Sequence, residues 1–130
     1  MVSALKKSRS DIIRDFIQAY NSFDMDGMLM HLHPAVKFKN ISGGKTDIET
    51  NGKVEFENLA RSSAALFNSR EQQIISMKEY GNKVDVAIEF KGILAAEMLP
   101  GLKAGDTLIM KGRSEYTFQE NLIVSVIDES

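Results

Sequence analysis

The sequence contains no cysteine and no tryptophan, and it has only two histidines in 130 residues. Without cysteine the chain can form no disulfide, no thiol nucleophile and no thiolate metal site. His31 and His33 are two residues apart, so on a helix their side chains would point about 200° apart. No third histidine or cysteine is present to complete a zinc site. We therefore expect no bound metal.

An excess of charge of one sign is also lacking. The sequence has sixteen Lys and Arg residues and eighteen Asp and Glu residues, so its formal net charge is -2. A nucleic-acid-binding domain normally carries a net positive charge. No stretch approaches the roughly 20 apolar residues of a membrane helix, and the N-terminal segment lacks the apolar region of a signal peptide. We expect a cytoplasmic protein that binds neither nucleic acid nor a membrane.

What is present fits one domain, residues 1–130, with 43% hydrophobic residues to form a core. Apolar residues recur at helical spacing in residues 10–23, which predicts a first helix. A short second helix should begin at Asp24 and end near His33, because the residue before a proline avoids the helical region. Residues 53–67 have the pattern of a third helix.

The apolar period changes from helical to two after residue 71, which is typical of strands. Residues 71–96 and 107–130 each have the pattern of a hairpin, and residues 35–41 have the pattern of an earlier strand. Helices together with consecutive antiparallel strands predict an α+β domain. A long sheet of this kind should twist and curl around the helices, and so enclose an internal pocket.

Polar residues on otherwise apolar strand faces are the candidates for a site. Side chains two residues apart on a strand point to the same face. Asn40 therefore shares a face with Phe38, Ser114 shares a face with Tyr116, and Asp128 ends the apolar face of the last strand. If these strands pair, three polar groups converge in an apolar cup, as in many small-molecule sites. The alternative is that Asp128, two residues from the end of the sequence, is solvated.

Residues 30–40, MHLHPAVKFKN, join the second helix to the first strand. We expect His31 and His33 to close the helix and Pro34 to turn the chain into the strand. His33 then has two open roles, as a structural residue at the helix end or as a proton carrier in the pocket. The opposite strand parity places several isoleucines on the outer sheet face: Ile75, Ile109, Ile123 and Ile127.

Two long segments, FIQAYNSFDMDGMLMHLHPAVKFKN and LKAGDTLIMKGRSEYTFQENLIVSVID, together with the helical stretch at residues 53–67, resemble the nuclear transport factor 2-like superfamily. The nearest group is the SnoaL-like and ketosteroid-isomerase-like proteins. The resemblance implies one SnoaL-like domain with a cone-shaped α+β barrel, also described as a cystatin-like roll. In it a curved sheet, mixed or antiparallel, wraps around three N-terminal helices and encloses a deep internal pocket. It also implies a homodimer formed through the outer sheet face.

The resemblance can be compared with known chemistry at each matching position. Ketosteroid isomerases carry a carboxylate base, a tyrosine and an aspartic acid at the positions that match Asn40, Phe16 and Ser114, so all three depart. SnoaL-type polyketide cyclases use an acidic residue near the end of the last strand, which Asp128 matches. Limonene-epoxide hydrolases need an arginine inside the pocket, whereas strand parity puts Arg113 on the outer face.

The residues and the resemblance together leave three hypotheses. The first is a cofactor-free proton-transfer enzyme (an isomerase, polyketide cyclase or dehydratase). In it a desolvated Asp128 with a raised pKa moves the proton, and Asn40 and Ser114 bond a carbonyl or enolate oxygen. The second is a protein that binds an apolar metabolite without turnover, and the third is a dimeric interaction domain. The expected pocket residues are Phe16, Tyr20, His33, Phe38, Phe56 and Tyr116.

Overall fold

The computed structural model describes residues 7–98 and 100–130. Its six strands form one open sheet in the order β2-β1-β6-β5-β4-β3. β1 and β6 run parallel, and the other neighbouring strands run antiparallel. The predicted α+β class is confirmed. Along the chain the elements are α1 (Arg9–Asn21), α2 (Met25–Leu29), β1 (Leu32–Ser42), β2 (Lys45–Asn51), α3 (Lys53–Ala64), β3 (Phe67–Tyr80), β4 (Lys83–Leu94), β5 (Thr107–Gln119) and β6 (Leu122–Glu129).

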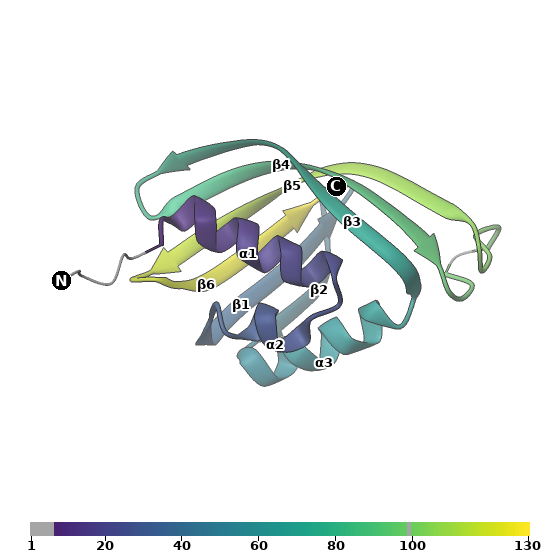
Figure 1. Ribbon diagram of the computed structural model, residues 1–130, viewed down its shortest axis with the longest axis horizontal. Coiled ribbons are helices and arrows are strands. Elements are labelled where there is room, and N and C mark those ends of the chain that lie inside the picture. Colours follow the sequence, from purple (N-terminus) through teal and green to yellow (C-terminus); the bar gives the residue numbers. More distant parts are fainter. Residues whose placement is uncertain (1–6, 99) are drawn as a thin grey trace.

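The sheet is strongly curved, and the helices lie against its concave side. The long strands β3, β4 and β5 arch over α1, while α3 packs against β1 and β2, and α2 packs against α1 and α3 (Figure 1). This curvature follows from the twist that every strand of such a long sheet contributes. The concave side is therefore covered by helices near one end and leaves room for a cavity beside α3.

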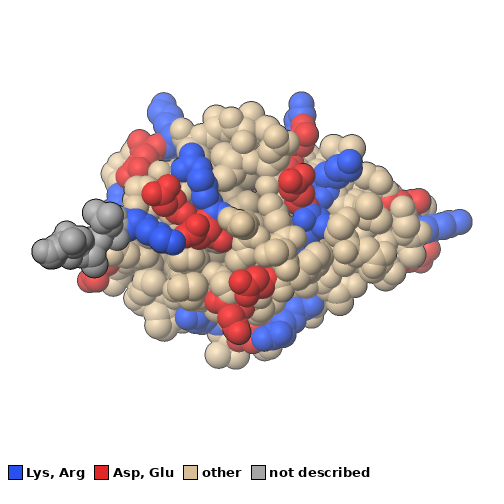
Figure 2. Space-filling model, in the orientation of Figure 1, with Lys and Arg blue, Asp and Glu red and all other residues tan. Residues whose placement is uncertain are grey.

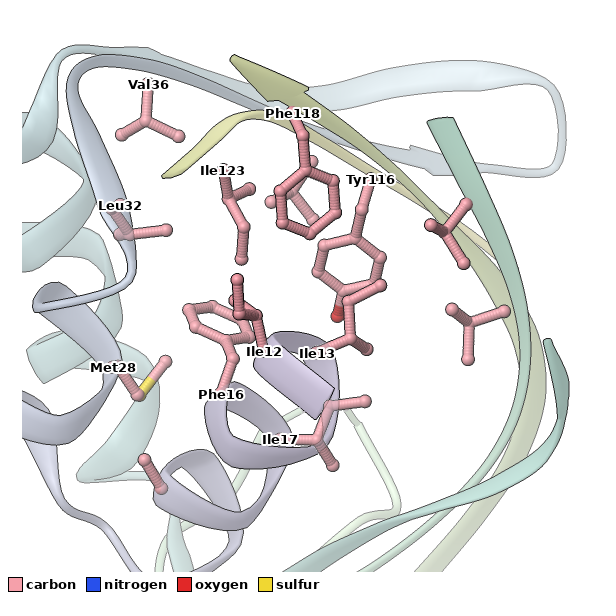
Figure 3. Packing of buried hydrophobic residues seen from close by; sticks show 14 of the residues in the cluster. Ile12, Ile13, Phe16, Ile17, Met28, Leu32, Val36, Tyr116, Phe118 and Ile123 are labelled. Carbon is pink, nitrogen blue, oxygen red and sulfur yellow. The ribbon is translucent and has the colours of Figure 1, made fainter. Parts of the chain in front are cut away.

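The first helix is positioned by its cap and by its apolar face. The hydroxyl Oγ of Ser8 accepts a hydrogen bond from the backbone N–H of Asp11 at 3.1 Å, which satisfies one of the free N–H groups of the first turn. The apolar residues at helical spacing then face the sheet, where they meet side chains of β5 and β6 (Figure 3). The buried residues of this helix are Ile12, Ile13, Phe16, Ile17 and Ala19.

One prediction of strand parity is wrong. Ile123 was expected on the outer face, but it is fully buried, with an exposed fraction of 0%, and it points into the core (Figure 3). The cause is a register shift between β5 and β6, where Thr117 pairs with Ser125 but Phe118 pairs with Ile123. The extra residue in β6 reverses the inward and outward alternation. Ile75 and Ile109 are exposed as expected, at 61% and 63%.

The connection from the second helix to the first strand also differs from the prediction. α2 ends at Leu29, and β1 already begins at Leu32, so His33 lies in the strand and does not close the helix. Pro34 lies within β1 as well, at a register shift in the pairing with β6. Since proline has no N–H to donate to a ladder, it is tolerated in a strand at such an irregularity.

The surface seen in the orientation of Figure 1 carries charges of both signs. Lysine and arginine side chains alternate with aspartate and glutamate over this face, and an uncharged area lies between them (Figure 2). No helix within residues 7–98 and 100–130 combines the length and the apolar character needed to span a bilayer.

Candidate functional site

A cavity of about 370 Å³ lies between the helices and the concave face of the sheet. We call it the inner lobe. It continues into an outer lobe of about 230 Å³. Both lobes are bordered by Tyr20, Asn40, Ser63, Leu66, Gln72, Met98 and Asp128.

Aromatic side chains form much of the wall of the inner lobe. The ring of Phe16 packs edge-on against that of Tyr116, with 6.1 Å between centroids, and it lies 6.5 Å from that of Phe56. Phe38 completes the row, at 5.6 Å from Phe56. Edge-to-face contacts of this kind fix the ring positions. The aromatic residues thus pack against one another and line the cavity without filling it.

Asp128 provides the carboxyl group of the inner lobe. It pairs with Ser114 across β5 and β6, and the Ser114 hydroxyl donates a hydrogen bond to Oδ1 at 2.6 Å. In the described part of the chain no donor reaches Oδ2, which leaves that oxygen available to a ligand. Burial raises the pKa of Asp128 to about 6, although the bond from Ser114 lowers it. A carboxyl group of this kind exchanges protons close to neutral pH.

The two cavity tyrosines remain protonated donors beside this carboxyl group. Tyr116 is 2% exposed, and burial together with the charge of Asp128 raises the pKa of its phenol. Burial also raises the pKa of Tyr20, which the nearby Arg70 guanidinium partly offsets. A phenol with a raised pKa stays neutral, so it can donate a hydrogen bond to a ligand oxygen.

Asn40 lies next to Asp128, because the two residues pair across the parallel strands β1 and β6. Ser114, Asp128 and Asn40 therefore sit side by side on three neighbouring strands, as their parity predicted. The amide Nδ2 of Asn40, however, donates to Oδ2 of Asp47 at 3.2 Å and to Oγ of Ser42 at 3.4 Å. Its donors are already engaged, so the geometry favours the tyrosines over Asn40 as donors to a carbonyl oxygen.

Of the nine candidate residues, the structure gathers eight around the cavity. Seven border the inner lobe, and Ser114 borders the outer lobe and bonds to Asp128. His33 is not among the described residues that line either lobe. Its Nδ1 accepts a hydrogen bond from the backbone N–H of Ala35 at 3.0 Å, so it stabilises the start of β1. The seven are Phe16, Tyr20, Phe38, Asn40, Phe56, Tyr116 and Asp128.

Sequence reasoning missed Arg70, a charged residue that borders the inner lobe. Arg70 lies near the start of β3 and is only 5% exposed. Its strand parity matches that of Gln72 and Ile74, so the inward direction was readable once Ile74 was placed in the core. Arg70 was missed because the predicted strand began at residue 71, and because the polar run REQQ at residues 70–73 is typical of a solvated segment. Within the described residues, no group of three metal-binding side chains lies close enough to hold an ion.

The sequence matches no protein-family model and no curated protein. At the level of structure, IdmH from Streptomyces antibioticus, a proposed polyketide cyclase, is similar with a TM-score of 0.77 at 15% identity, over 94% of this chain and 91% of that one. AclR from Streptomyces galilaeus, a proposed hydroxylase, is similar with a TM-score of 0.73 at 16% identity, over 92% and 86% of the two chains.

A protein from Catenulispora acidiphila with a ketosteroid-isomerase-like fold, solved in complex with trimethylamine, has a TM-score of 0.73 at 11% identity. The structural match covers 91% of this chain and 83% of that chain. A protein from Burkholderia pseudomallei described as nuclear transport factor 2-like has a TM-score of 0.74 at 17% identity, over 92% and 88% of the two chains. The chain therefore has the nuclear transport factor 2-like fold of the SnoaL-like and ketosteroid-isomerase-like proteins, as the sequence predicted.

The hydrogen bond from Ser114 gives a direct prediction about the carboxyl group. Replacing Ser114 by alanine should raise the pKa of Asp128 above about 6, because this bond stabilises the ionised form. Carbon-detected NMR titration of the carboxyl group measures the change. Ser125→Ala is the matched control, because Ser125 lies on the same strand as Asp128 and forms no side-chain hydrogen bond with it. An unchanged or lower pKa in Ser114→Ala would show that the bond does not act on the carboxylate.

Proposed function

We propose that the protein is a cofactor-independent enzyme that transfers a proton on a small, largely apolar carbonyl compound. The reaction classes that fit are isomerisation, aldol-type cyclisation and dehydration, which all begin with removal of a proton next to a carbonyl group. The observation that carries the proposal is the carboxyl group of Asp128 on the wall of an apolar cavity, with a pKa of about 6. A base with a pKa near the working pH is the form that this chemistry needs.

Each step can be assigned to residues of the cavity. The free Oδ2 of ionised Asp128 takes the proton from the carbon atom, and the electron pair moves onto the carbonyl oxygen as an enolate. The phenol groups of Tyr20 and Tyr116 are the donors placed to stabilise that oxygen. The protonated Asp128 then returns its proton to another carbon in an isomerisation, or to a departing hydroxyl group in a dehydration. Ser114 holds the carboxyl group in position.

The first test needs no knowledge of the natural substrate. We expect the wild-type protein to accelerate exchange of the protons next to the carbonyl group of 2-tetralone, an enolisable bicyclic ketone, for deuterium from solvent. Proton NMR in deuterated water follows the loss of those signals. The rate should rise with pH through about 6 and then level off, because the base is then ionised. A rate equal to that of buffer alone, while the ketone binds, would count against catalysis.

That last outcome would support the second candidate, a protein that holds an apolar metabolite without turnover. The observation that favours it is the engagement of the Asn40 amide by Asp47 and Ser42, which removes one expected oxygen donor. The exposed Ile75 and Ile109 on the outer sheet face support the further proposal of a homodimer through that face. A small apolar ligand, a cytoplasmic location and a single SnoaL-like domain remain parts of the same proposal.

A further inference from the structure

Arg70 is a buried cation at the cavity without a carboxylate partner. Arg70 is 5% exposed and borders the inner lobe. The one hydrogen bond that it forms within the described residues runs from Nε to the backbone carbonyl of Tyr20, at 2.8 Å. No ion pair of Arg70 is present in the same part of the chain. The phenol of Tyr20 also interacts with the guanidinium group, and no carboxylate of the described residues pairs with either terminal Nη group.

The guanidinium group is nevertheless firmly placed. Its central carbon lies 3.7 Å from the ring centroid of Tyr20 and 4.4 Å from that of Phe23. Phe23 has a φ of 58°, which is uncommon for a residue with a side chain of that size. The chain thus accepts a strained backbone conformation at the residue whose ring stacks on Arg70. The two aromatic rings stack on the guanidinium plane, and the Nε–H group is bonded to the Tyr20 carbonyl. The edge of the guanidinium group that carries the Nη atoms is therefore the part that can bind a ligand.

The helix end explains only part of this arrangement. α1 has no basic residue in its last turn, and Arg70 supplies the cation that bonds a terminal carbonyl there. That role uses Nε alone. A largely buried cation without a counter-ion is costly, and a carboxylate that accepts two parallel hydrogen bonds is the group whose shape fits the guanidinium edge.

The positions of the charges narrow the ligand further. Of the described residues that line the inner lobe, Arg70 and Asp128 are the two that carry charge, and they form no ion pair with each other. Tyr20 lies within electrostatic reach of both. We propose that Arg70 binds a carboxylate of the ligand, so that the substrate is a largely apolar keto acid whose reacting carbon faces Asp128. The carboxylate site stands without catalysis, and only the reacting end rests on the proposed function.

The test uses a matched pair of probes, 2-naphthoate and its neutral isostere 2-naphthamide, with binding measured by isothermal titration calorimetry. Wild-type protein should bind the carboxylate about tenfold more tightly than the amide, or better, because a charge-assisted bidentate pair is lost with the amide. Arg70→Met keeps an apolar side chain of similar length and should lose this preference. Arg70→Lys keeps the charge without the planar edge and should retain only part of it.

The control variant is Arg61→Met, which removes an exposed arginine of α3 that pairs with Glu57 at 2.7 Å and should leave the preference intact. A measurement on the wild type avoids any folding defect of the variants. The NMR signal of the Arg70 Nε–H group should shift on addition of 2-naphthoate and stay in place with 2-naphthamide. Equal affinity for the two probes, no binding of the carboxylate at millimolar concentration, or a preference that survives in folded Arg70→Met would each overturn the proposal.

The two proposals fail in different ways. Selective binding of 2-naphthoate, together with binding of 2-tetralone but no exchange of its protons, would support the carboxylate site and count against the enzyme. Exchange that depends on Asp128, together with equal binding of the two naphthyl probes, would support proton transfer and overturn the role of Arg70.

Discussion

Replacement of Asp128 by asparagine should lower the rate of proton exchange on 2-tetralone by about 10²- to 10⁴-fold, the usual contribution of a positioned general base. Asparagine has nearly the same shape and can still accept the hydrogen bond from Ser114, so the cavity should keep its form. It has no basic oxygen with a pKa near neutrality. The loss should appear in the exchange rate at saturation, while the affinity for the ketone changes little.

The matched control for this variant is Asp26→Asn, which removes one carboxylate from an exposed position in the first turn of α2. It should exchange protons at the wild-type rate. The rise of the wild-type rate with pH through about 6 should also be absent from Asp128→Asn. Exchange that persists at the wild-type rate in Asp128→Asn would remove Asp128 from the mechanism and leave the pocket with no assigned base.

Strand parity was sufficient to bring the polar candidates together. Asn40 lies far from Ser114 and Asp128 in the sequence, and each of the three was chosen because it interrupts an apolar strand face. The structure pairs Ser114 with Asp128 and Asn40 with Asp128 on adjacent strands. Alternation along a strand depends only on the backbone, so the inward direction of a residue is readable wherever the strand is regular.

Where the strand is irregular, the same reasoning fails. The register shift after Thr117 turns Ile123 into the core, although simple alternation sends it outward. Pro34 lies at a similar irregularity, and β1 begins at Leu32, before His33, although the sequence predicted that the strand follows Pro34. Such shifts depend on how two strands twist against each other, which the local sequence does not specify.

Arg70 illustrates a different limit. Its inward direction follows from parity, but its use depends on Tyr20 and Phe23, which approach it from the end of a distant helix. Sequence spacing cannot show that the guanidinium group of Arg70 lies against two aromatic rings and has no carboxylate partner. The missing partner becomes visible only when the packed helix and strand are seen together, and that is why the carboxylate site emerged from the structure alone.

The second large effect concerns stability, because the property that suits Asp128 for proton transfer should weaken the fold. Burial raises the pKa of Asp128 from 3.8 to about 6, so the native state holds a proton that the unfolded state has already lost between these values. The free energy of unfolding should therefore fall as pH rises from about 4 to about 6 and stay low above that. At about 1.4 kcal/mol per pKa unit, reduced for partial exposure, the loss is on the order of 1–3 kcal/mol.

Asp128→Asn should escape this loss, since asparagine is neutral at every pH in the range. The variant should resemble the wild type in stability near about pH 4 and exceed it by on the order of 1–3 kcal/mol near about pH 8, as measured by urea denaturation. Asp26→Asn controls for the removal of one charge from the chain. A variant that is no more stable than the wild type at the higher pH would mean that the carboxylate is well solvated or paired, and the proposed base would lose its raised pKa. Lower activity together with higher stability above pH 6 is the pair of effects expected when a buried carboxylate is kept for chemistry.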